Sequence, residues 1–173
     1  VRLAHPALYL GWIALSLYLA AYIPCFIALS RVAVQRLRWP LAVAAPIVWV
    51  GLELIRGRLL SGFTGGMLGH TQSFVPPVIQ VADLGGAYLL SGRMMVIASC
   101  LVECGVVWRD RHAVPRALPR FVKFAGLALA VFAGLLGYGA WRLARSPLRD
   151  VDPSQRLRIA LIQESIDTIF EYN

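Results

Sequence analysis

Long apolar runs separated by short basic stretches are the main pattern along this chain. The first run, residues 3–30, contains no Asp, Glu, Lys or Arg. A helix rises about 1.5 Å per residue, so this run exceeds the ~30 Å hydrocarbon core of a bilayer. It is too long for the apolar region of a signal peptide, and no small-residue cleavage motif follows it. We predict a membrane helix here, kinked at Pro24.

Three further apolar runs follow, over residues 39–55, 78–107 and 121–141. Together with the first run they predict four membrane helices. The alternative, a buried helix of a soluble core, seldom has so long an uncharged stretch as the first run. The third run contains charged side chains that are costly in lipid, so we expect them to face the bundle or the interface. These are Asp83, Arg93 and Glu103.

Composition supports a membrane protein. The chain is 58% hydrophobic and 15% charged, with a mean hydropathy of +0.66. Soluble domains are usually about 45–50% apolar and about 25% charged. The high apolar content excludes intrinsic disorder, and three cysteines are too few for a disulfide scaffold.

The basic charge is concentrated in two loops. Of the net charge of +8, loops 31–38 and 108–123 carry +3 and +4. An even number of spans separates them, so they face one side, and the positive-inside rule makes that side cytoplasmic. Loop 56–77 and everything after residue 142 should then face the exterior. Nucleic-acid binding is the competing interpretation of the charge, but interleaved aromatics or a recognition helix are missing, so we expect no nucleic-acid partner.

The tail of the chain differs from the rest. Residues 142–156 carry turn signals and are interpreted as a linker. Residues 157–163 are short, partly alternating and rich in apolar side chains, which predicts a β-strand. One strand cannot form a domain. We therefore expect a transmembrane region over 1–141 and the start of a truncated soluble domain over 157–173, in a fragment cut at both ends.

A series of motifs resembles the membrane region of apolipoprotein N-acyltransferases. The motifs are Ala-Pro-x-x-Trp at 45–49, Glu-x-x-Arg-Gly at 53–57, Ser-Gly-Phe at 61–63 and Leu-Gly-His-Thr-Gln at 68–72. Each motif alone is weak, and their order is the specific signal. Ile-Ala-Leu-Ile-Gln at 159–163 is similar to the first strand of the family's nitrilase-like domain.

The resemblance implies a fold and an activity. The expected fold is an all-α polytopic membrane bundle, about four transmembrane helices here, followed by the first β-strand of a truncated α/β nitrilase-like domain. The expected reaction moves an acyl chain from a phospholipid, through a cysteine thioester, to the N-terminal amine of a diacylglyceryl-cysteine lipoprotein. It implies the bacterial inner membrane, with the exterior loops in the periplasm. No cofactor or metal is expected.

The family's catalytic Glu, Lys and Cys are expected beyond Asn173, so the fragment itself is predicted to be inactive. Three cysteines lie within predicted membrane helices, where we expect them to pack in the core: Cys25, Cys100 and Cys104. Lys123 is the only lysine and falls on the predicted cytoplasmic side.

Five residues of the exterior loop are candidate substrate contacts. Glu53 and Arg56 are spaced to pair on one helix, and Arg56 or Arg58 is suited to bind a phospholipid phosphate. His70 and Gln72 are candidates to line the entrance to the hydrolase domain. The alternatives are a local structural pair and a surface histidine. Thr-Gly-Gly at 64–66 replaces the family's Pro-Trp, which leaves donor binding open.

Other classes of function stay open. One is a non-catalytic polytopic membrane transporter or scaffold subunit, although no internal repeat is visible. Another is a degenerate acyltransferase that acts as a membrane module only.

Overall fold

The described part of the protein is helical. The computed structural model describes residues 6–59, 62–111 and 117–145, and this part contains no strand. The predicted strand at 157–163 and most of the predicted linker lie outside the described residues. The elements are α1 (Pro6–Ala20), α2 (Tyr22–Gln35), α3 (Leu41–Arg56), the 3-10 helix η1 (Leu68–Gln72), α4 (Pro76–Ile79), α5 (Ala82–Arg109) and α6 (Ala117–Ala144).

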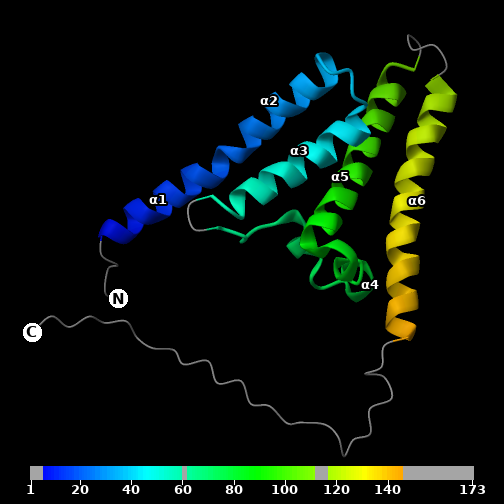
Figure 1. The fold of residues 1–173 in the computed structure, drawn as a ribbon. Helices are drawn as coiled ribbons and strands as arrows, with labels where there is room; N and C mark the ends of the chain where they lie inside the picture. Colours follow the sequence, from blue (N-terminus) through cyan, green and yellow to red (C-terminus); the bar gives the residue numbers. More distant parts are fainter. Residues whose placement is uncertain (1–5, 60–61, 112–116, 146–173) are drawn as a thin grey trace, which may run out of the picture.

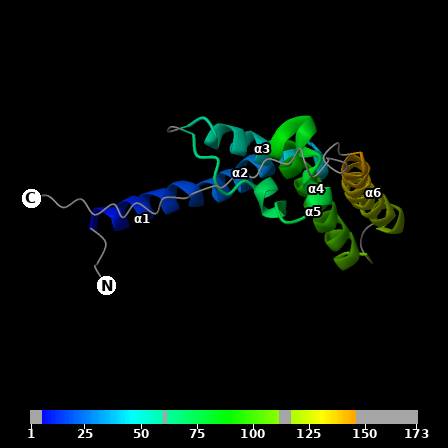
Figure 2. The same cartoon turned by 90° about the horizontal axis from the view of Figure 1, so that it is seen from below.

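The helices pack in chain order. α1 and α2 form one long oblique rod, and α3 returns beside α2 and packs against α5 (Figure 1). α6 runs back along α5, and the short α4 lies against α6 at the lower end of this pair. Seen from below, α1 projects away from the other helices (Figure 2). α5 is therefore the central helix, with α3 and α6 both packed on it.

Within the described residues, three helical stretches are long and apolar enough to cross a membrane: Ala7–Gln35, Ala82–Arg109 and Ala117–Ala144. The predicted second span, 39–55, is the 16-residue helix α3. At about 24 Å it is shorter than the ~30 Å hydrocarbon core. Among the described residues, three of the about four predicted membrane helices are thus long enough to span a bilayer, and α3 is the short one because Trp39 and Pro40 stay outside the helix and Pro40 is extended.

Helix boundaries also differ from the apolar runs. The first span continues to Gln35, so Arg31 lies within a helix and not in the connecting loop. The rod is interrupted at Ala21, because Pro24 has no N–H to donate to the carbonyl of Ala20. The last span runs from Ala117 to Ala144, so it includes part of the predicted loop 108–123 and the first residues of the predicted linker.

The third predicted span, 78–107, is divided into α4 and α5. Within α5 the backbone turns at Gly86, whose φ is +64° and ψ is −168°. Only glycine adopts this conformation readily. The turn lets α4 lean onto α6, where side chains of all three helices form a buried cluster: Val78, Val81, Leu90 and Leu135.

Small side chains bring α3, α5 and α6 close together. Ala42, Cys100 and Ala128 meet in one buried cluster. Such residues let helix backbones approach in lipid, where there is no hydrophobic force between helices. Cys100 and Cys104 are buried, which confirms core packing for both, whereas Cys25 is exposed and the same expectation is wrong there.

Gly139 provides a test of the contact between α4 and α6. A Cβ at this position would overlap the carbonyl oxygen of Pro77. We expect Gly139→Ala to destabilise the protein by about 1–3 kcal/mol, because the two backbones would have to separate. The measurement is thermal unfolding by circular dichroism in detergent.

Gly137→Ala is the matched control, because a Cβ there has no atom within 4 Å. It should leave stability unchanged or raise it by up to about 1 kcal/mol through helix propensity. Equal melting temperatures for the two variants would contradict the packing described here.

Candidate functional site

The carboxylate of Glu53 connects α3 to η1. Glu53 is 4% exposed and lies near the end of α3. Its Oε1 accepts hydrogen bonds from Trp49 Nε1 at 3.0 Å and from the backbone N–H of Leu68 at 2.8 Å. Leu68 is the first residue of η1, where the N–H groups lack partners within the helix. Glu53 therefore fixes the start of η1.

A second side chain holds η1 from the opposite helix. The backbone N–H of Gly69 donates to Ser91 Oγ at 2.9 Å. Ser91 is fully buried on α5. The segment is thus fixed between α3 and α5 by two consecutive backbone N–H groups.

Arg56 contacts the glycine-rich loop and α2. Its guanidinium donates to the carbonyl oxygen of Gly66 at 3.3 Å and lies 5.7 Å from the ring centre of Tyr22. Within the described part of the chain, no ion pair joins Arg56 to Glu53, so the predicted direct pair is not formed. Arg56 Nε and Glu53 Oε2 are both buried without a hydrogen-bond partner. Both residues line one small cavity of about 20 Å³, large enough for one water molecule.

The remaining predicted site residues lie on exposed or half-buried positions nearby. Arg58 is exposed just past the end of α3, and His70 is exposed on η1. Gln72 is half-buried, and its Nε2 donates to Thr71 Oγ1 at 3.0 Å. The structure therefore connects Glu53 and Arg56 to the segment that carries His70 and Gln72. It leaves Arg58 and His70 accessible.

Sequence reasoning missed a polar cluster between α5 and α6. Arg142 Nε lies 2.7 Å from Asp83 Oδ2, and Tyr138 donates to the same carboxylate at 2.9 Å. Tyr138 and Arg142 are four residues apart, on one face of α6, which is the signal that could have indicated a shared partner. The cluster joins the start of α5 to the end of α6. Asp83 itself lies in the first turn of α5.

An open apolar groove of about 750 Å³ runs between α3 and α5. Its α3 wall includes Pro46, Val50 and Leu54, and its α5 wall includes Tyr88 and Gly92. The groove also contains Arg93, which is half-buried, in agreement with the expectation that this charge faces the bundle.

The fold and the site define a polytopic helical membrane protein with a glycine-rich loop held against its central helices. Residues 2–100 match the family profile described as the apolipoprotein N-acyltransferase N-terminal domain. The chain belongs to this family.

Three curated apolipoprotein N-acyltransferases are similar to the chain. The protein from Rhodopirellula baltica is 34% identical over 184 residues, which cover 99% of this chain and 31% of the relative. The Geobacter metallireducens protein is 35% identical, with 73% and 23% covered, and the Gloeobacter violaceus protein is 30% identical, with 94% and 30% covered. The chain thus spans less than a third of each of these relatives. No solved structure matches it.

The hydrogen bond between Glu53 and Leu68 yields a prediction. Glu53→Ala leaves the N–H groups of Leu68 and Trp49 without their acceptor, so we expect a loss of about 1–3 kcal/mol in stability. Amide hydrogen exchange over residues 67–72 should become faster, because η1 loses one of its two attachments.

Glu53→Gln keeps an oxygen acceptor and should have a smaller effect. Arg58→Ala serves as the control, because Arg58 is exposed. Equal exchange rates in Glu53→Ala and Arg58→Ala would refute the role assigned to the carboxylate.

Proposed function

We propose that the chain forms the lipid-binding membrane region of an apolipoprotein N-acyltransferase. The complete reaction would transfer an acyl chain from a phospholipid, through a cysteine thioester, to the amine of a diacylglyceryl-cysteine lipoprotein. Family membership supports the reaction class. The observation that carries the assignment to this region is the apolar groove between α3 and α5, next to a loop with exposed Arg58 and His70.

The groove suits one acyl chain of the donor phospholipid. Its lining from Pro46 to Leu54 covers about 12 Å of α3, at about 1.5 Å per residue. Apolar walls with few polar groups are typical of sites for apolar ligands. Arg58 is exposed beyond the end of α3, which supports it as the contact for a headgroup phosphate, whereas Arg56 is engaged with Gly66 and Tyr22.

The acyl-transfer chemistry itself is assigned outside the described helices. Cys25, Cys100 and Cys104 lie in membrane-spanning stretches, where apolar surroundings disfavour a thiolate nucleophile. Lys123 lies near the start of α6, whereas the cluster beside α4 lies at its end. We propose that the catalytic Glu, Lys and Cys follow Asn173 and that this chain supplies the donor side only.

We propose that the chain lies in the bacterial inner membrane, in the orientation that its basic residues indicate. α2 and α5 end at the same end of the bundle, and α4 lies at the other (Figure 1). The basic residues that follow α2 and α5 therefore share one end, which the positive-inside rule makes cytoplasmic. The glycine-rich loop and η1 would face the periplasm, where a lipoprotein acceptor is available.

A groove-filling variant tests the donor site. We expect a phosphatidylethanolamine that carries a photoactivatable acyl chain to label the α3–α5 groove of the chain in nanodiscs. Gly92→Leu should reduce this labelling several-fold, because a side chain at residue 92 points at Val50 across the groove. Peptide mapping by mass spectrometry measures the labelled positions.

The control is Gly126→Leu on α6, where a Cβ meets no atom within 4 Å. It adds the same side chain away from the groove and should not change labelling. Labelling spread evenly over all helices, or lowered equally by both variants, would argue for a scaffold without a donor site.

The location of the chemistry gives a second test. The 173-residue chain alone should transfer no acyl group to a synthetic diacylated lipopeptide, with the full-length Geobacter metallireducens relative as the positive control. Mass spectrometry of the lipopeptide detects the added acyl chain.

Sequencing of the DNA after the Asn173 codon should reveal a Glu, a Lys and a Cys in a hydrolase-like context. Turnover by the chain, or a natural stop codon at this point, would exclude the proposed division.

A further inference from the structure

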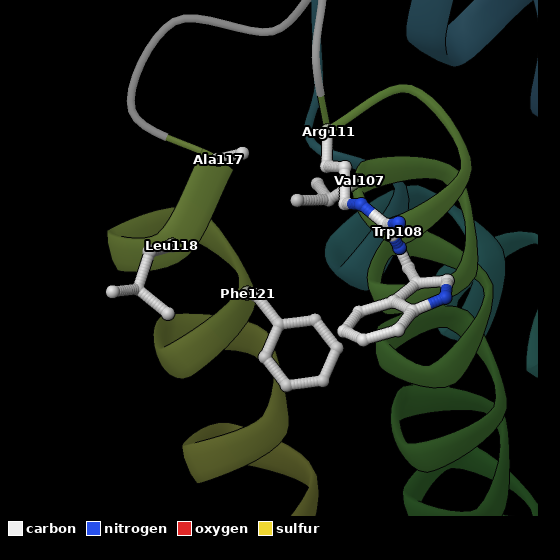
Figure 3. Close-up of a pocket in the computed structure, with 6 residues that line it drawn as sticks. All are labelled: Val107, Trp108, Arg111, Ala117, Leu118 and Phe121. Atoms are coloured by element: carbon white, nitrogen blue, oxygen red, sulfur yellow. The ribbon is translucent and has the colours of Figure 1, made fainter.

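A second cavity lies at the opposite end of the α5–α6 pair, between the end of α5 and the start of α6. It measures about 380 Å³ and is walled mainly by apolar groups. Figure 3 shows Trp108 on α5 facing Phe121 on α6, with Leu118 on the outer side and Arg111 at the rim. The two aromatic ring centres are 6.2 Å apart. The cavity thus opens where two membrane-spanning helices end.

Basic residues lie on both helices that form this cavity. The guanidinium of Arg111 lies 4.8 Å from the ring centre of Trp108 and lines the cavity. Arg120 and Lys123 are exposed in the first two turns of α6. Asp110 is the only acidic residue in the described stretches 106–111 and 117–123, and it is paired with Arg109 at 3.1 Å.

This combination matches one class of ligand. Tryptophan at a helix end is typical of the membrane interface, and basic pockets between membrane helices on the cytoplasmic side bind anionic lipid headgroups. A guanidinium matches the geometry of a phosphate oxygen pair. The apolar walls require a hydrocarbon chain, which a free phosphate does not supply.

We propose that the cavity formed by Val107, Trp108, Arg111, Ala117, Leu118 and Phe121 is a binding site for an anionic phospholipid. An acyl chain lies against the apolar side chains that line the cavity, beside the packed rings of Trp108 and Phe121, and the headgroup phosphate binds the guanidinium of Arg111. Arg120 and Lys123 add attraction to the anionic leaflet. The site differs from the proposed donor site in position, because it lies at the other end of α5 from Gly85 and Asp83.

Native mass spectrometry of the delipidated chain tests this site with two lipids of identical acyl chains. Phosphatidylglycerol should bind about tenfold more tightly than phosphatidylcholine, because both carry the phosphate but the choline ammonium cancels its charge and weakens the attraction of the nearby basic residues. Arg111→Gln should remove this preference. Arg145→Gln is the matched control, because Arg145 stacks on Trp141 at 4.9 Å in the same way at the far end of α6.

A second variant keeps every charge. Ala117→Phe places a large side chain in the cavity and should reduce the binding of both lipids, while circular dichroism checks that the helices remain. Equal affinity for the two lipids, or equal loss in Arg111→Gln and Arg145→Gln, would overturn the proposal. A dimer mass without lipid adducts would also overturn it, because the cavity would then receive a second copy of the chain.

Discussion

The arrangement of the loop and the central helices depends on one buried carboxylate. A backbone N–H that is buried away from water needs a hydrogen-bond partner within the protein. Glu53 is this partner for Leu68, and Ser91 is the partner for the next residue. The same carboxylate binds Trp49. The first residue of the Glu-x-x-Arg-Gly motif is therefore the attachment of η1, and a substitution of Glu53 acts first on the position of that segment.

The helices were predictable, whereas their ends were not. Apolar runs report the transfer of side chains into lipid, and this signal located all the long helices. Helix ends depend on the backbone. Pro24 interrupts the first rod because it has no backbone N–H to donate. Pro40 is extended and directly precedes α3, and the positive φ of Gly86 turns the chain near the start of α5. Arg31 could be included in a helix because a long side chain can reach the interface while its backbone stays helical.

The positions of the candidate residues followed from the sequence, whereas their contacts did not. Local spacing placed Glu53 and Arg56 on one helix, and from that spacing a direct pair was expected. Their actual partners, Leu68 and Gly66, are ten or more residues away along the chain. Such partners depend on how α3, α5 and the loop pack together, which no local pattern encodes. Ser91 gave no signal at all, because a serine in an apolar helix is common.

The two ends of α5 differ in how their charges are balanced. At its start, the carboxylate of Asp83 is neutralised by Arg142 and bonded by Tyr138. At its other end, Arg111 is stacked on an aromatic ring beside the basic first turns of α6, with Asp110 already paired to Arg109. The positive-inside rule counts Lys and Arg near the ends of membrane helices, and acidic residues affect it little. The basic residues at the end of α5 and the start of α6 therefore bear on the proposed orientation, and the same residues underlie the proposed binding of anionic lipid.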